Sequence, residues 1–262
     1  MANDPVNTTR DENLRKIVVV GGTSAMAIGC VKLWLQEQVS EVLLIGRDSD
    51  RLERVANDLN IRFPESRVTY AATGLCDVGD IGRAVGMACA SSAPNIVLVA
   101  HGSLPDQKEC ESSLPACHEA LEVNGTSPAL WAGAFALGMK DVADARLILV
   151  GSVAGDRGRQ SNYAYGAAKA LLARYAEGLQ HRLALDRSSL KVVMVKPGPT
   201  STPMTAHLSA QGQRMASVEE VARCIVRGAL KGKPVVYAPG KWRIIMLVIR
   251  HLPSVVFHRL KI

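Results

Sequence analysis

Short runs of aliphatic and β-branched residues recur along the chain, separated by amphipathic stretches. The runs are Ile17–Val20, Val42–Ile45, Val68–Ala71, Ile96–Ala100, Leu147–Val150 and Val192–Val195, with Val235–Tyr237 as a further candidate. Such uninterrupted runs are typical of parallel strands that are buried on both faces. The stretches between them have helical periodicity, as where Leu52, Val55 and Leu59 share one face. This alternation predicts an α/β fold, a single Rossmann-type doubly wound parallel sheet with helices on both faces.

The alternating pattern occupies most of the chain, and the two ends differ from it. Residues 1–14 are polar and are expected to be a disordered N-terminal extension, whereas residues 15–240 carry the strand and helix signals. Residues 241–262 are basic and apolar and are assigned to the same domain as its C-terminal segment. We find no internal repeat and no linker, and 262 residues suit one large α/β domain.

Composition narrows the class of protein. Hydrophobic residues make up 48% and charged residues 21%, which excludes a disordered protein. The net charge is +7, but the chain holds too few aromatic residues to provide stacking platforms, so we expect no nucleic-acid partner. The six cysteines form no CxxC pair, which argues against a metal site. No segment resembles a signal peptide, and a cytoplasmic location is therefore expected.

The first apolar run ends in a glycine-rich turn, Gly21-Gly22-Thr23-Ser24-Ala25-Met26, that leads into a helix. Glycines at such a turn let the backbone approach a pyrophosphate, whose charge the helix N-terminus stabilises. The expected cofactor-binding residues here are Gly21, Thr23, Ser24, Ala25 and Met26. The alternative is an ordinary glycine-rich turn without a ligand.

The second apolar run ends in Gly46-Arg47-Asp48. An acidic residue at the first loop position would bind a ribose 2′-hydroxyl and repel a 2′-phosphate, but that position holds Gly46. The Arg47 guanidinium suits a phosphate, so NADPH is favoured over NADH. Asp48 argues the other way unless it caps the following helix.

The fifth apolar run leads into Gly151-Ser152, and Tyr165 follows Ser152 by thirteen residues. Lys169 lies four residues after Tyr165, which places both on one face of a helix. A nearby ammonium favours the phenolate, so Lys169 is expected to lower the pKa of Tyr165 from about 10. Tyr165 would then exchange a proton with a ketone or an alcohol, while Ser152 binds the substrate oxygen.

These motifs resemble the short-chain dehydrogenase/reductase family over nearly the whole chain. The resemblance implies a catalytic role for Asn124 in a proton relay and a contact of Lys169 with the nicotinamide ribose. It further implies cofactor contacts for Asp77, Val78, Ala100, Gly102, Pro197, Gly198, Thr200 and Thr202, besides Arg47, Tyr165 and Lys169. The family's Asn-Asn-Ala-Gly is Val99-Ala100-His101-Gly102 here, a departure that is expected to weaken bonding between strands at this point without removing a catalytic group.

The composition of the C-terminal segment indicates what kind of substrate or surface the protein contacts. Residues 244–249 are apolar, and residues 241–262 contain five Lys or Arg and no acid. Six apolar residues are too few to span a bilayer. The segment would lie at a membrane interface, form the wall of a lipid pocket, or be a buried helix or dimer contact.

Within the family, the chain resembles the reductases of decaprenylphosphoryl-2-keto-β-D-erythro-pentose, through Gly21–Ser24, Pro203–Leu208, Tyr237–Pro239 and Arg250–Pro253. This implies reduction of a polyprenyl-phosphate-linked 2-keto sugar by NADPH, an oxidase partner and a peripheral place on the inner face of the plasma membrane. The alternatives are a reductase of a soluble ketone and a non-catalytic NADP(H)-sensing regulator. A homo-oligomer is also expected from the family.

Overall fold

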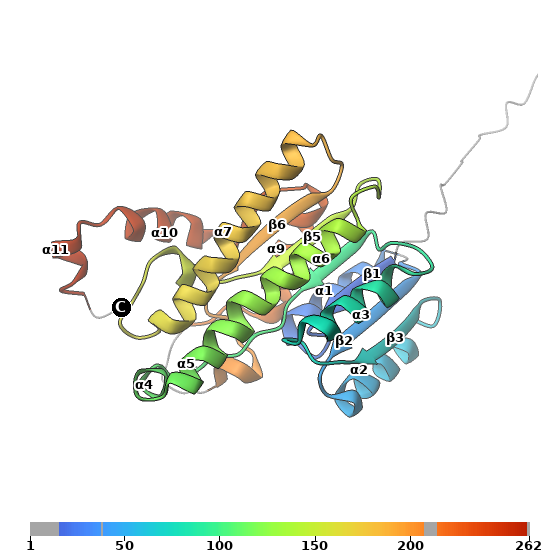
Figure 1. The fold of residues 1–262 in the computed structure, drawn as a ribbon, viewed down its shortest axis with the longest axis horizontal. Helices are drawn as coiled ribbons and strands as arrows, with labels where there is room; N and C mark the ends of the chain where they lie inside the picture. The colour runs from blue at the N-terminus through green and yellow to red at the C-terminus, as the bar shows by residue number, and fades with distance from the viewer. Residues whose placement is uncertain (1–15, 38, 207–213, 261–262) are drawn as a thin grey trace, which may run out of the picture.

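The computed structural model describes residues 16–37, 39–206 and 214–260, so the expected extension 1–14 and residues 261–262 lie outside the described part. Seven parallel strands form one sheet in the order β3-β2-β1-β4-β5-β6-β7 (Figure 1). The strands are β1 (Lys16–Val20), β2 (Glu41–Gly46), β3 (Arg67–Ala72), β4 (Ile96–Val99), β5 (Arg146–Val150), β6 (Lys191–Pro197) and β7 (Val235–Ala238). Each apolar run predicted as a strand is therefore a strand, and the predicted fold is confirmed.

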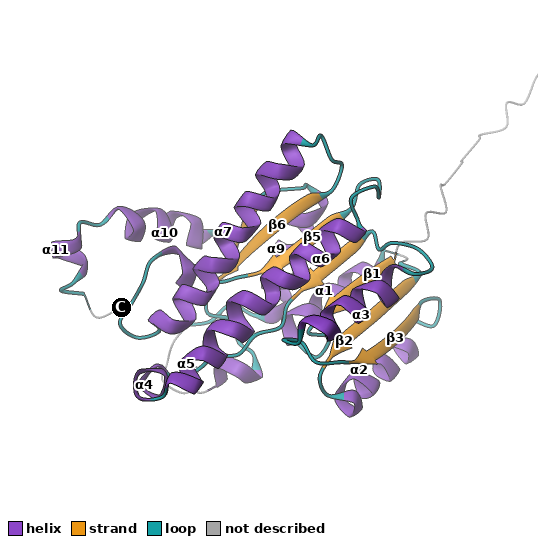
Figure 2. Cartoon of the chain, in the orientation of Figure 1, coloured by secondary structure: helices purple, strands orange, loops and turns teal. Residues whose placement is uncertain are grey.

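Helices cover both faces of the sheet, as Figure 2 shows. One face packs against α1 (Ala25–Gln36), α2 (Ser49–Arg62) and α9 (Val218–Leu230), and the other against α3 (Val78–Cys89), α6 (Ser127–Gly138) and α7 (Tyr163–Leu185). Trp34 is fully buried in the first layer, and Trp131 stacks on Phe135 in the second. Four of these helices, α1, α2, α3 and α9, begin at side-chain caps such as Ser24 and Asp48, which accept hydrogen bonds from backbone N–H groups of the first turn.

Shorter elements lie between and beyond these helices. They are α4 (Gln107–Ser112), α5 (Leu114–Leu121), the π-helical η1 (Glu122–Thr126), the 3₁₀ turns η2 (Val153–Asp156) and η3 (Pro203–Thr205), α10 (Lys241–His251) and α11 (Ser254–Phe257). β1 lies between β2 and β4. The strand order therefore reverses at β1: β2 and β3 follow on one side of it, and β4 to β7 follow on the other. A crevice is expected there, at the carboxyl ends of the strands.

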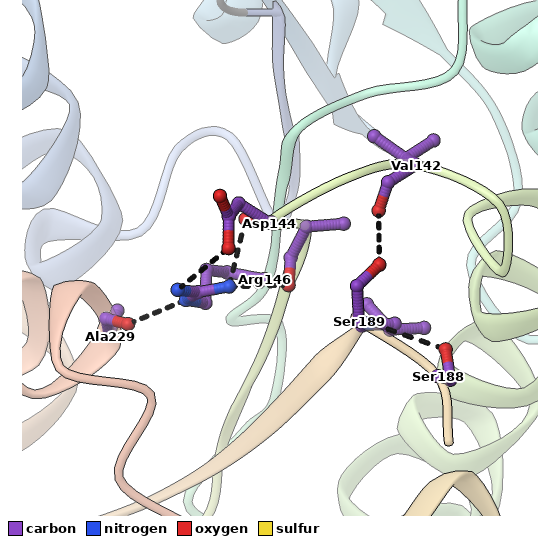
Figure 3. Close-up of polar contacts among 8 residues, drawn as sticks. Val142, Asp144, Arg146, Ser188, Ser189 and Ala229 are labelled. Carbon is purple, nitrogen blue, oxygen red and sulfur yellow. Dashed lines mark hydrogen bonds and ion pairs between the residues drawn. The ribbon is translucent and has the colours of Figure 1, made fainter. Parts of the chain in front are cut away.

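The opposite end of the sheet is closed by polar contacts that do not concern the site (Figure 3). The Arg146 guanidinium, at the start of β5, donates to the carbonyl oxygens of Asp144 and Ala229 at 2.8 and 3.0 Å. Ser189, just before β6, donates to the carbonyl of Val142 at 3.1 Å. These bonds satisfy carbonyl groups of the loops and of the last turn of α9, which stabilises this end of the sheet.

The C-terminal helices α10 and α11 project beyond the sheet and its helical layers (Figure 1). One side of this segment is attached to the domain: Met246 is fully buried, and Arg157 donates to the carbonyl of Leu252 at 2.7 Å and stacks on the Phe257 ring at 3.8 Å. The other side exposes apolar residues, among them Ile244 and Leu247. Among the described residues, no helix combines the length and apolar character that crossing a membrane requires.

Candidate active site

A cavity of about 360 Å³ opens at the carboxyl ends of β1, β2, β4 and β5. Many of the residues predicted to contact a cofactor or to act in catalysis line it. They are Gly21, Thr23, Ser24, Ala25, Met26, Arg47, Ala100, Gly102, Asn124, Tyr165, Lys169 and Thr202. The cavity lies at the carboxyl ends of β1 and β4, where the strand order reverses, which is where the sequence places the ligand site.

Gly21 is required by the backbone of the first turn. Its φ is +89°, and a Cβ atom there would lie 2.6 Å from the backbone nitrogen of His101. The two loops after β1 and β4 therefore approach each other as closely as glycine allows. The N-terminus of α1 follows at once, and its N–H groups favour an anion.

The alanines of the glycine-rich turn do not obstruct the cavity. Ala25 lines it, whereas Ala27 is buried in the core. Gly29, in the first turns of α1, lies where a Cβ would meet Val218 and Ala222 of α9 at 3.0 and 3.1 Å. Its small size serves the packing of α1 against α9 rather than ligand binding.

Two arginines border the cavity at the end of β2. Arg47 and Arg51 both line it, and both are exposed. Asp48 accepts a hydrogen bond from the backbone nitrogen of Arg51 at 3.0 Å as the N-cap of α2, so this carboxylate has the capping role considered from the sequence. The pair of guanidinium groups suits a phosphate. Arg51 was not predicted, because its position in the first turn of α2 depends on the path of the loop.

Asp77 and Val78 lie beside the cavity and not in its lining. Asp77 caps α3 by accepting from the backbone nitrogen of Asp80 at 2.8 Å, and Val78 is largely exposed. Their contact with a cofactor stays a prediction. The lining at this point comes from Leu75 and Cys76 instead.

His101 lies in the segment where the sequence departs from the family motif. The hydrogen bond between the neighbouring strands is nevertheless present there, because the Ala100 nitrogen donates to the Val20 carbonyl at 2.8 Å, so the expected weakening is not found. The His101 ring is buried, and its Nε2 lies 2.8 Å from the Ser127 hydroxyl. Ser127 donates to the carbonyl of Leu75 at 2.6 Å, so it accepts from Nε2–H and leaves Nδ1 unprotonated. Burial, and then the charges of Lys169 and Arg47, lower the pKa of His101 to about 3.

A second cavity, of about 650 Å³, adjoins the first and contains the other part of the predicted site. Ser152, Tyr165, Pro197, Gly198, Thr200 and Thr202 line it. Tyr165 and Thr202 line both cavities, so the two spaces meet at the Tyr165 side chain. Because Pro197, Gly198 and Thr200 line only the larger cavity, a cofactor that reaches the predicted contacts would extend from the smaller cavity into the larger one and meet a substrate there.

Close packing of η2 against α7 places Ser152 beside Tyr165. A Cβ on Gly155 would lie 2.8 Å from the Ala170 nitrogen and the Lys169 carbonyl carbon, and one on Gly166 would lie 2.9 Å from the Ala154 carbonyl oxygen. Only residues without a side chain fit at this contact. Ser152 and Tyr165, thirteen residues apart in the sequence, are thus brought together because η2 and α7 pack against each other at Gly155 and Gly166.

The electrostatics of Tyr165 differ from the sequence-based expectation. Burial raises its pKa, and a hydrogen bond with Ser152 lowers it in part, whereas the expected lowering by Lys169 is not found. Lys169 is buried, and its ammonium donates to the carbonyl of Val150 at 3.3 Å. Burial lowers the pKa of Lys169 to about 8, so the ammonium is mostly charged at neutral pH and loses its proton in mildly alkaline solution.

Asn124 lies in the π-helical turn η1 and is fully buried. Its Oδ1 accepts from the Ser103 nitrogen at 2.9 Å, and its Nδ2 donates to the carbonyl of Ala120 at 2.9 Å. The side chain therefore fixes the loop after β4 at the edge of the smaller cavity. Its part in a proton relay stays a prediction.

Behind the larger cavity, a buried polar cluster joins η2, β6 and β7. Lys196 forms an ion pair with Asp156, and the Tyr237 hydroxyl donates to the same carboxylate at 2.7 Å. Trp242 of α10 packs so closely on Gly198 that a Cβ there would overlap its indole ring. The C-terminal segment thus packs against the turn at Pro197 and Gly198. Neither contact could be predicted from spacing along the chain.

Among the described residues, no group of three His, Cys, Asp or Glu side chains is placed to hold a metal ion. The polar groups of the site are instead a phenol, a hydroxyl, an ammonium and an amide. Together with the anion-favouring turn, they suit proton transfer beside a bound dinucleotide.

Comparisons with known proteins agree with this geometry. The family model described as short chain dehydrogenase matches residues 15–213. An uncharacterized oxidoreductase of Streptomyces coelicolor is 29% identical over 94% of this chain and 96% of its own length. An uncharacterized oxidoreductase of Staphylococcus aureus is 24% identical over 84% of this chain and 93% of its own.

Solved structures share the fold. A short chain dehydrogenase from Burkholderia cenocepacia in complex with NADP has a TM-score of 0.79 at 22% identity, over 94% of this chain and 97% of that chain. A short-chain dehydrogenase from Sphingobium yanoikuyae in complex with NADPH has a TM-score of 0.77 at 18% identity, over 92% and 97%.

Proposed function

This chain belongs to the short-chain dehydrogenase family of oxidoreductases, and on that premise we propose that it reduces a ketone with NADPH as the electron donor. The observation that carries the proposal is that Ser152, Tyr165 and Lys169 gather where the smaller cavity, at the carboxyl ends of the strands, meets the larger one. Arg47, which follows β2, and Arg51, in the first turn of α2, favour the 2′-phosphate of NADPH.

Bound NADPH would supply the hydride. Ser152 donates a hydrogen bond to the ketone oxygen, where negative charge develops. Tyr165 donates the proton that completes the alcohol, and its raised pKa keeps the phenol protonated at neutral pH. Lys169 holds positive charge beside this ring, with its ammonium 5.6 Å from the ring centre.

Nicotinamide fluorescence during titration with NADPH and NADH tests the cofactor. We expect tighter binding of NADPH, and Arg47→Gln or Arg51→Gln should weaken it about tenfold or more while leaving NADH affinity unchanged. Arg54→Gln is the matched control, since Arg54 is an exposed residue of α2 outside both cavity linings. Equal affinity for both cofactors in the wild type would contradict the assignment.

Turnover separates an enzyme from a sensor. We expect NADPH oxidation with a ketone panel and its loss in Tyr165→Phe, with NADPH affinity retained. A regulator that only senses NADP(H) would bind NADPH and turn over no ketone. A reductase of soluble ketones would act on small ketones and bind no membrane.

We further propose a substrate carried on a polyprenyl phosphate, a 2-keto sugar supplied by an oxidase partner, at a membrane surface. The support is the outer side of α10 and α11, where Ile244, Leu247, Val248 and Val255 are 57–69% exposed. Residues 241–260 also contain Lys241, Arg243, Arg250 and Arg259 and no acid. Exposed apolar residues flanked by cations suit an anionic lipid surface.

Sedimentation with phosphatidylglycerol vesicles tests this surface. Binding should be lost in Leu247→Glu/Val248→Glu and kept in Leu185→Glu, a change at a leucine of α7 that is more exposed than either. Vesicle binding that is absent in the wild type, or unchanged in the double variant, would count against the membrane proposal and leave the reductase proposal standing.

A further inference from the structure

The larger cavity contains an arginine that the proposed chemistry does not use. Arg159 lies in the loop between η2 and α7 and lines the cavity together with Ser152 and Tyr165. Its Nε atom is buried and has no hydrogen-bond partner within the described part of the chain. Its Nη2 atom contacts the sulfur of Met246 at 3.6 Å, which is a weak acceptor.

The neighbouring carboxylates are already engaged. Asp156 favours the charged form of Arg159, but its two oxygens bind Lys196 and Tyr237. Asp106, which also lines the cavity, is exposed and caps α4 by accepting from the Glu109 nitrogen at 3.0 Å. Burial lowers the pKa of Arg159, the direction expected when a guanidinium lacks a full counter-charge.

A second polar group of the cavity is also without a partner. The Oδ1 atom of Asn162 is buried and accepts no hydrogen bond within the described residues, and Asn162 lines the same cavity. An amide oxygen in this situation suits a hydroxyl group of a ligand. The cavity therefore has a reaction end at Ser152 and Tyr165, and two further polar atoms, Arg159 Nε and Asn162 Oδ1, without a hydrogen-bond partner among the described residues.

We propose that Arg159 is a specificity-determining residue that binds an oxyanion of the substrate, with Asn162 binding a substrate hydroxyl. The substrate is then a hydroxylated ketone that carries a phosphate ester or a carboxylate. The inference rests on the proposed reductase function and defines its substrate class. A guanidinium binds either oxyanion through paired hydrogen bonds.

Calorimetric titration with three anionic probes tests the site: phenyl phosphate, methyl phenyl phosphate and benzoate, with benzyl alcohol as the neutral comparison. The protein is saturated with NADP+, since the cofactor phosphate site would otherwise bind phosphate. At least one anion should bind, and Arg159→Gln should weaken it about tenfold or more. Arg174→Gln, which removes an exposed cation of α7, should change nothing.

The titrations show whether Arg159 binds an anion and which kind of anion it prefers. Arg159-dependent binding supports the proposal, and the preferred probe distinguishes a phosphate monoester, a phosphodiester and a carboxylate. Binding of no anion, or equal binding by Arg159→Gln with unchanged melting temperature, overturns it. If NADP+ itself does not bind, the NADPH proposal fails, and the titration is repeated on Arg47→Gln/Arg51→Gln, where Arg159 is still tested.

Discussion

The Lys169 ammonium lies 5.6 Å from the centre of the Tyr165 ring and donates to the Val150 carbonyl at 3.3 Å. It is held beside the ring by the strand end and is nearly sequestered from solvent. Because burial lowers the pKa of Lys169 to about 8, its charge is present at neutral pH and is lost in mildly alkaline solution.

Ketone reduction should therefore fall as pH rises through about 8. The kcat/KM profile reports groups of the free enzyme, so it should show this loss. Lys169→Arg keeps the charge to higher pH, and although its rate is expected to be lower, its profile should stay flat through this range. The same fall in both proteins would assign the titration to another group.

Gly155→Ala should lower both catalytic activity and stability. Its methyl group would meet the backbone of Lys169 and Ala170 at 2.8 Å and separate η2 from α7. We expect a loss of about 1–3 kcal/mol in the free energy of unfolding and a decrease in kcat of about tenfold or more, because Ser152 moves relative to Tyr165.

Gly158→Ala is the matched control, since a Cβ there meets no atom within 4 Å. Its kcat should equal that of the wild type, and its stability should be unchanged or slightly higher. Denaturant unfolding and steady-state rates on the two variants make the comparison. Equal activity in both would show that Ser152 does not depend on the glycine contact.

The sequence was sufficient for the features that local pattern determines. Apolar runs predicted all seven strands, and the Ser152, Tyr165 and Lys169 spacing predicted residues that lie together. Features that depend on tertiary packing were not predicted. Trp242 meets Gly198, and Arg159 meets Met246, only because one side of α10 packs beside β7 and η2.

The direction of the Tyr165 pKa shift also required the structure. Spacing along a helix brings an ammonium near a phenol, but it does not determine how far each group is removed from water. Here desolvation outweighs the favourable contact with Ser152 and raises the pKa.

The buried pair Lys196–Asp156 should be sensitive to loss of one partner. Lys196→Met leaves the Asp156 carboxylate buried with only the Tyr237 hydroxyl, so we expect a loss of about 3–5 kcal/mol in the free energy of unfolding. Arg174→Gln, which breaks the exposed pair with Glu177, should cost less than about 1 kcal/mol. Urea unfolding of both variants gives the comparison, and similar losses would contradict the difference expected from burial.

His101 should make the protein sensitive to acid. Its pKa is about 3 in the folded chain, and an unfolded histidine titrates near 6.5. Between these values the unfolded state binds more protons, so the stability that the neutral ring provides above pH 6.5 is lost as pH falls toward 3. Between pH 7 and pH 5 the loss is about 2 kcal/mol.

His101→Gln removes this titration while keeping a polar side chain. Its free energy of unfolding at pH 7 should be lower than that of the wild type, because the bond to Ser127 is altered. Between pH 7 and pH 5, however, it should decrease by about 2 kcal/mol less than in the wild type. Urea unfolding at both pH values measures the difference. Parallel losses in the two proteins would mean that the His101 ring accepts a proton in the folded state as readily as in the unfolded one, and would contradict the prediction.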